Sequence, residues 1–198
     1  MRKRESVLVL LLEILFSGDL WCQAVSLDDA LREMDVGLIL PPNIEMIPIL
    51  VQDDLEYQAA FRLKGANYEV RISLFPHSFL VRLSGNRDID RYIPLFSMGL
   101  LAAMAKESLP SCKSAELPGP TVRKEFGADT GMTALVKGNK SDFGRGYAQI
   151  AVVFLYKAGK GVVVVSFLYN EPRELQMEGL EFSQAYYCFR FNESVPEK

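Results

Sequence analysis

The chain has 198 residues, with 22 Lys and Arg against 25 Asp and Glu, so its formal net charge is −3. Nucleic-acid-binding domains normally carry a basic excess, and this balance therefore argues against a nucleic-acid partner. Hydrophobic residues make up 49% of the chain, which is enough to build a packed core, and there is one histidine. A single histidine excludes a zinc centre that needs several histidines.

The first 24 residues have the layout of a signal peptide. Three basic residues at positions 2 to 4 precede an apolar run from Val7 to Phe16, which only Glu13 interrupts. The run is about half the ~20 residues that a membrane-spanning helix needs, so we expect no permanent transmembrane anchor after cleavage. Cys22-Gln23-Ala24 offers a small-x-small cleavage pattern. Residues 25–198 would then be a single domain that is periplasmic or secreted.

Two alternatives to a soluble exported domain stay open. Cys22 would anchor the domain through a lipid if it were the modified residue, although Leu20 and Trp21 before it are larger than the residues that this processing prefers. Residues 7 to 16 would be a buried helix if the protein stayed in the cytosol. The charge in front of the apolar run favours export over this second alternative.

Cleavage would leave two cysteines, Cys112 and Cys188, in a compartment that permits disulfides. They form a candidate disulfide. Closing a loop of this length would stabilise the fold by roughly 4 kcal/mol in the chain-entropy model. The alternative is two separate buried thiols.

The first half of the domain predicts one helix followed by antiparallel strands. Ser26 is placed to cap a short helix that ends at Gly37. Alternating apolar and polar residues then predict strands with one solvent-facing side. The expected strands cover residues 44–51, 57–63, 68–74 and 79–83, with a hairpin at 65–67 between the second and third.

The second half predicts a buried helix, a meander of three strands and a last helix. Apolar residues crowd nearly every face between residues 90 and 109, with Pro94 in the first turn. Residues 110–121 have the composition of an irregular connection. The expected strands cover residues 132–136, 148–156 and 162–169, the last being a central strand covered on both faces, and a final amphipathic helix follows Asn170. Residues 185–191 fit either a helix or a strand.

These elements predict an α+β fold, an α/β/α sandwich around a mainly antiparallel sheet of about six or seven strands. The element order resembles the PsbP-like and Mog-like fold family over residues 38 to 191, with Tyr68 to Pro76 before the long helix and Phe126 to Asp129 before the meander. Members of that family act mainly as non-enzymatic adaptors, so the resemblance implies an adaptor. None of the family's functional residues is matched in this chain.

The sequence lacks the motifs of several common enzyme classes. A phosphate loop around Lys140 would need glycines where Ala134 and Asn139 stand. The only histidine, His77, follows Pro76 in a turn, and no Gly-x-Ser-x-Gly elbow presents a serine. No Cys-x-x-Cys pair serves redox chemistry. We therefore predict no enzymatic activity and no cofactor.

One stretch, residues 129 to 145, combines glycines with mixed charges, a composition that lets backbone groups meet a ligand or partner. The candidate interaction residues are Asp129, Thr130, Lys137, Lys140, Asp142 and Arg145. We expect an exported, non-enzymatic accessory or adaptor protein that binds another envelope protein. The alternative is a periplasmic carrier of a small apolar ligand, held between the sheet and the buried helix near Met98 and Met104. An enzyme that uses Asp129, Thr130, Lys137 and Asp142 is a third hypothesis.

Overall fold

The computed structural model describes residues 25–49, 55–85, 89–105, 112–138, 142–144, 146–171, 174 and 185–192. The fold is α+β, as the sequence predicts, and its main sheet has seven strands, all paired antiparallel, in the order β2-β3-β4-β8-β7-β6-β5. A second, two-stranded sheet joins β1 to β9. The predicted signal peptide with Cys22, and residues 175–184 of the predicted last helix, lie outside the described residues.

The described residues form nine strands. Their bounds are β1 Val36–Leu38, β2 Ile44–Met46, β3 Ala59–Leu63, β4 Glu69–Pro76, β5 Lys113–Glu116, β6 Thr130–Lys137, β7 Gln149–Lys157, β8 Gly161–Tyr169 and β9 Phe189–Phe191. β8 is the middle strand of the seven, and all nine of its residues are buried. The prediction of a central strand covered on both faces is therefore confirmed.

The helices are short except for one. They are α2 Leu27–Met34, α3 His77–Ser84, α4 Ile93–Ala105 and α5 Gly119–Thr121, with a 3-10 turn η1 (Ile89–Arg91) and a π-helical turn η3 (Val122–Phe126). Ser26 caps α2, since its Oγ accepts a hydrogen bond from the Asp29 amide. Pro94 stands in the first turn of α4, as expected. No helix in the described ranges is long and apolar enough to cross a membrane.

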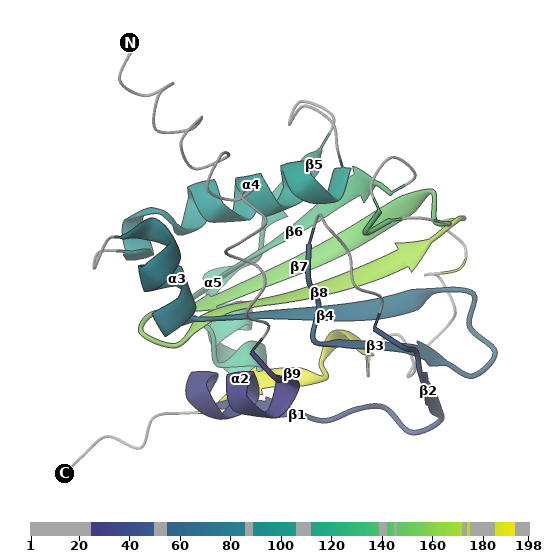
Figure 1. Ribbon diagram of the computed structural model, residues 1–198, viewed down its shortest axis with the longest axis horizontal. Helices are drawn as coiled ribbons and strands as arrows, with labels where there is room; N and C mark the ends of the chain where they lie inside the picture. The colour runs from purple at the N-terminus through teal and green to yellow at the C-terminus, as the bar shows by residue number, and fades with distance from the viewer. Residues whose placement is uncertain are drawn as a thin grey trace.

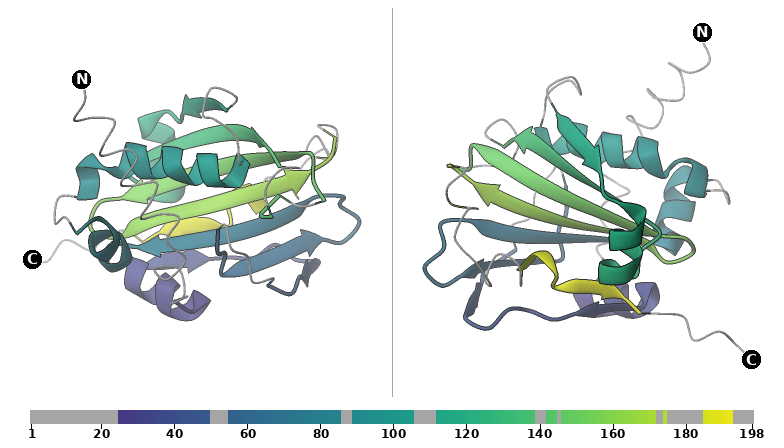
Figure 2. Two further views of the ribbon diagram at one scale, coloured as in Figure 1. Left: turned by 45° about the horizontal axis from the view of Figure 1, so that its top comes forward. Right: turned by 180° about the vertical axis from the view of Figure 1, so that it is seen from behind.

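Helices cover both faces of the sheet (Figure 1). One face packs against α3 and α4, and we call its hydrophobic cluster the α4-side core. The other packs against α2, η3 and the β1–β9 ribbon, and we call its cluster the α2-side core. The rear view of Figure 2 shows α5 and β9 lying over this second face. Alternate residues of β7 and β8 enter the two cores, so the sheet separates them.

The β7–β8 hairpin, predicted at residues 157 to 161, is confirmed. Its last residue, Gly161, has φ +130° and lies against the end of β4. A Cβ at this position would overlap the carbonyl oxygen of Phe75, and the His77 amide donates a hydrogen bond to the Lys160 carbonyl beside it. Only glycine fits this close approach of the hairpin to the neighbouring strand.

Residues 79–83 do not form the strand that the sequence predicts after the one at residues 68–74. They belong to helix α3, in which Leu80 and Leu83 are buried three residues apart and point to the α4-side core. Pro76 at the N-cap and Gly85 at the C-cap, with φ +58°, delimit the helix. Eight residues with four apolar positions fit both periods, and packing against the sheet selects the helix.

Several short strands also differ from the prediction. β5 lies in the segment expected to be irregular. Its four residues are exposed at the sheet edge and include no large apolar side chain, so they carry no apolar pattern that would predict a strand. β2 ends at Met46 instead of continuing to residue 51. Residues 189–191 form β9, which pairs with β1, so this part of the segment 185–191 is a strand.

No disulfide joins Cys112 and Cys188. Cys112 packs against the α4-side core and Cys188 is buried in the α2-side core. Because the main sheet separates the two cores, the candidate bridge is not formed. The structure corresponds to the alternative in which the two cysteines are not joined.

Candidate functional site

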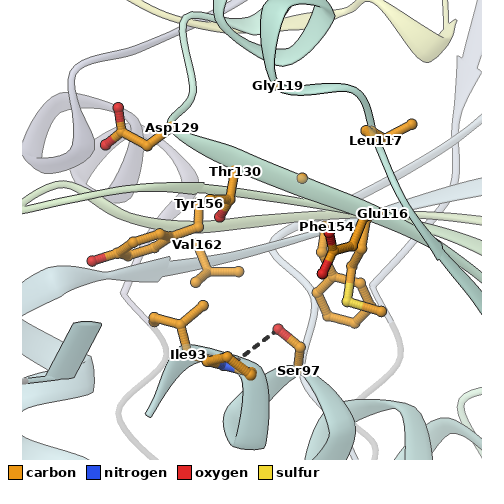
Figure 3. A pocket seen from close by; sticks show the side chains of 13 residues that line it. Ile93, Ser97, Glu116, Leu117, Gly119, Asp129, Thr130, Phe154, Tyr156 and Val162 are labelled. Carbon is orange, nitrogen blue, oxygen red and sulfur yellow. Dashed lines mark hydrogen bonds between the residues drawn. The ribbon is translucent and has the colours of Figure 1, made fainter. Parts of the chain in front are cut away.

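An open pocket of about 340 Å³ lies between the first turns of α4 and the α4-side face of the sheet (Figure 3). Five parts of the chain build its wall: α4, the connection from β5 to α5, and the adjoining parts of β6, β7 and β8. The lining residues are Ile93, Pro94, Ser97, Glu116, Leu117, Gly119, Asp129, Thr130, Gly131, Met132, Phe154, Tyr156 and Val162. The volume is at the lower end of the roughly 300–1,000 Å³ typical of small-molecule sites.

The floor and the helix side of the pocket are apolar. Phe154, Tyr156 and Val162 stand side by side on β7 and β8, since Tyr156 is paired with Val162 across the hairpin. Ile93 of α4 faces them across the opening (Figure 3), and Pro94 also lines the pocket. This wall of aliphatic and aromatic groups would bury the apolar part of a ligand.

Two polar groups of the wall offer acceptors to a ligand. Ser97 is buried, and its hydroxyl donates its one proton to the Ile93 carbonyl at 3.0 Å. Its Oγ can therefore only accept a hydrogen bond from a ligand. Glu116 stands on the opposite wall, and its carboxylate is turned into the pocket (Figure 3). Within the described part of the chain it has no hydrogen-bond or ion-pair partner.

Asp129 and Thr130, two residues of the predicted interaction loop, lie at the rim of this pocket. Thr130 opens β6 and directs its side chain inward, whereas the Asp129 carboxylate turns away from the other lining residues (Figure 3). Asp129 Oδ2 accepts a hydrogen bond from the Ala158 amide at 2.9 Å, and its own amide donates to the Tyr156 carbonyl at 2.8 Å. Asp129 therefore holds the β7–β8 turn in place.

The other residues of that loop do not join the pocket. Lys137 is at the far end of β6 and lies about 24 Å from Thr130, because seven steps of ~3.4 Å separate the first and last residues of the strand. Asp142 follows beyond it and is half-buried. Lys140 and Arg145 lie outside the described residues. The described members of the predicted loop are therefore split between the two ends of β6, with Asp129 and Thr130 at one end and Lys137 and Asp142 at the other.

The methionines expected beside a ligand are also misplaced. Met98 is 42% exposed and points away from the sheet, while Met104 is fully buried in the α4-side core. Neither lines the pocket, which lies at the first turns of α4 and contains Met132 instead. The general location, between the sheet and the buried helix, matches the sequence hypothesis, but the residues differ.

A polar network is buried on the same face at the opposite end of the strands. Arg71 Nε lies 2.6 Å from Glu69 Oε1, and Arg71 also donates to the Phe143 carbonyl. Tyr147 donates to Glu69 Oε2 at 3.0 Å and accepts from Arg62 at 3.2 Å. The guanidinium lies 4.8 Å from the Tyr57 ring centroid and 5.1 Å from that of Phe143.

This network fastens the connection between β6 and β7 to the sheet. Phe143 is fully buried, and burial raises the pKa of the Tyr147 phenol, with the nearby Glu69 carboxylate adding to the effect. A Cβ at Gly144 would overlap Gly138, so the two glycines let the connection fold back on itself. Residues 142–144, the described part of this glycine-rich stretch, are therefore packed against the sheet.

The alternating pattern of β4 predicts that Glu69 and Arg71 face the solvent, and this prediction is wrong. Both side chains are buried, because the β6–β7 connection covers this end of the strand. The signal available in the sequence was the opposite charge at spacing two, which places both groups on one face of a strand. Ser97 and Glu116 of the pocket carry no local motif at all.

Metal and thiol chemistry find little support in the described residues. No three of their His, Cys, Asp and Glu side chains are grouped so as to hold a metal ion. Burial raises the pKa of the Cys188 thiol to about 12, so it is protonated at neutral pH and is a poor nucleophile.

Comparison with known proteins assigns no family. No family model matches the chain, and no curated protein or solved structure matches it significantly. The resemblance to PsbP-like and Mog-like proteins stays a prediction from the sequence.

Proposed function

We propose that this chain is an exported, non-enzymatic binding protein that carries a small, mainly apolar ligand in the pocket between α4 and the sheet. One observation carries the proposal: five separate parts of the chain converge on a single concave volume with an apolar floor and a few polar groups. Such a combination is the usual form of a small-molecule site. Export rests on the predicted signal peptide at residues 1–24.

A ligand would enter from the side of Glu116 and Thr130 and place its apolar part against Phe154, Tyr156 and Val162. The volume suits a single ring or a short chain better than a long lipid. The proposal includes no catalytic step, because the sequence carries no catalytic motif.

The test is saturation-transfer NMR with phenethyl alcohol, a small neutral probe, on the full chain. A blocking variant, Thr130→Phe, puts a ring into the pocket from a rim position that tolerates aromatic residues in a strand. The matched control is Thr133→Phe, on the same strand but on its other face. We expect binding to the native chain and to the control, and at least a fivefold loss in the blocked variant.

Saturable binding that Thr130→Phe leaves unchanged would place the probe elsewhere and contradict the proposal. A complete lack of binding by the native chain would also contradict it. Thermal unfolding of each variant, followed by circular dichroism, separates a blocked pocket from a damaged fold.

A second candidate function is the adaptor role, in which the protein binds another envelope protein. It is favoured by three large apolar side chains exposed within eleven residues: Ile39 at 80%, Met46 at 53% and Ile49 at 53%. Met46 lies on β2, an edge strand of the main sheet as described. The resemblance to adaptor proteins points in the same direction.

The adaptor role is tested by co-purification from the native envelope. Met46→Asp should abolish recovery of a partner, whereas Met98→Asp, at an exposed methionine on α4, should not. A partner retained equally by both variants would contradict binding at the β2 edge.

A further inference from the structure

We propose that the pocket under α4 selects a cationic amphiphile, an apolar or aromatic body that carries one ammonium group, over neutral and anionic ligands of the same size. The inference rests on the proposed function and names the chemical class of its ligand.

The charges of the wall are of one sign. Among the thirteen lining residues, Glu116 and Asp129 are acidic and none is basic. Arg123 comes close to Gly119, since its guanidinium nitrogen would lie 3.5 Å from a Cβ at that position, but Arg123 does not line the pocket. A carboxylate ligand would thus meet the like charge of Glu116, and an ammonium would meet an opposite one, while Asp129 turns away and adds only to the negative charge at the rim.

The hydrogen-bonding capacity of Ser97 and Glu116 leads to the same class, whereas the inward Thr130 hydroxyl can either donate or accept. The Glu116 carboxylate only accepts hydrogen bonds. Ser97 Oγ has used its single proton on the Ile93 carbonyl, so toward the pocket it too accepts. Two acceptors on facing walls match an ammonium, which has three donors and no acceptor.

The aromatic floor adds a third, independent preference. Phe154 and Tyr156 lie on adjoining inward positions of β7, with their rings at the pocket (Figure 3). A cation near an aromatic face is attracted by the ring's electron density, which an anion is not. Glu116 and Phe154 line the same side of the pocket, with Met132 between them in the strand register, so an ammonium bound between the two would be attracted by both.

The experiment compares three probes that share one phenylethyl body: phenethylamine, phenethyl alcohol and phenylpropanoate. Dissociation constants are measured by NMR titration of the full chain at neutral pH and low ionic strength. We expect the amine to bind about threefold more tightly than the alcohol and about tenfold more tightly than the carboxylate, as suits a partly exposed ion pair. Salt should reduce this difference.

Two variants localise the effect. Glu116→Gln keeps the shape of the side chain and should bring the affinity for the amine down to that of the alcohol. Glu45→Gln removes the same charge from β2, at the opposite edge of the sheet, and should change nothing.

The outcomes separate the two claims. Equal affinity for all three probes, or tighter binding of the carboxylate, would overturn the ligand class and leave the proposed carrier function standing. If none of the three probes bound, the carrier function itself would fail, and the ligand class with it. An amine preference that survives in Glu116→Gln would overturn the role given to this residue.

Discussion

Arg71 and Glu69 form an ion pair on one face of β4 at 2.6 Å, with side chains that are 5% and 7% exposed. The pair is closed on every side. Tyr147 satisfies the second Glu69 oxygen, the Phe143 carbonyl accepts from Arg71, and the rings of Tyr57 and Phe143 flank the guanidinium. One end of the α4-side core is therefore held by charge and hydrogen bonds, and the other end is left open as the pocket.

Removing one partner of this pair should be costly. Arg71→Met would leave the Glu69 carboxylate buried beside Tyr147 without its cation, and we expect the free energy of unfolding to fall by about 3–5 kcal/mol. Urea denaturation followed by fluorescence measures this change. A loss below about 1 kcal/mol would mean that solvent reaches the pair.

The double variant Arg71→Met with Glu69→Met is the control for this prediction. It removes both charges together, so no unpaired ion stays buried, and we expect it to be more stable than Arg71→Met alone. A double variant less stable than the single one would show that the two charges do not act as a pair.

Gly161 should resist substitution more strongly than its neighbour in the same turn. Gly161→Ala forces a Cβ into the Phe75 carbonyl at φ +130°, whereas Gly159, at φ +70°, has open space around it. We expect Gly161→Ala to cost more than about 3 kcal/mol and Gly159→Ala about 1–2 kcal/mol. Thermal unfolding compares the two, and equal losses would contradict the close approach of the hairpin to β4.

Elements with a long, uniform pattern could be predicted from the sequence. The buried helix, the β7–β8 hairpin and the all-buried β8 follow from runs of apolar residues in which hydrophobic burial decides the structure. The prediction of a strand at residues 79–83 was wrong, because four apolar positions in the eight residues of α3 fit both the helical and the strand period. β1, β5 and β9 depend on pairing with distant strands, which no local pattern records.

The candidate site was harder to predict than the fold. Asp129 and Thr130 were identified by their loop composition, and both do lie at the rim of the pocket. Ser97 and Glu116 were missed, since they come from an apolar helix and a polar edge strand that meet only in the folded chain. Tertiary packing, and not spacing along the chain, brings Ser97 and Glu116 to the same pocket.

The cysteines should behave as residues that are not joined. Burial raises the pKa of Cys188 to about 12, so iodoacetamide should leave it unmodified in the folded protein. Unfolding without a reducing agent should expose both Cys112 and Cys188 to alkylation, which peptide mapping by mass spectrometry detects. If both were alkylated only after reduction, a disulfide would be present and the separation of the two cores would be wrong.

Asp35 should make a small, pH-dependent contribution to stability. A hydrogen bond from Asn192 lowers its pKa below the ordinary 3.8, and Lys160 adds to this. Because the folded-state pKa is depressed, the stabilisation is present above pH 3.8 and is lost as the pH falls through the lowered value.

The variant Asp35→Asn tests this contribution and keeps a side chain that tolerates the left-handed backbone at this position. The carboxylate is 41% exposed, so solvent screening limits the loss to roughly 1 kcal/mol or less at neutral pH. Urea denaturation at a series of pH values should show the difference from the native chain shrinking below pH 3.8. A difference that grows in acid would contradict the sign.

The most direct measurement of the central claim is NMR of the chain with labelled methionine methyl groups, titrated with phenethylamine. Met132 lines the pocket, whereas Met46 and Met98 are exposed at other places and Met34 is buried in the α2-side core. Binding under α4 predicts a saturable shift of the Met132 methyl signal with the other three unchanged. An unchanged Met132 methyl signal, with shifts at Met46 or Met98 instead, would contradict a ligand site between α4 and the sheet.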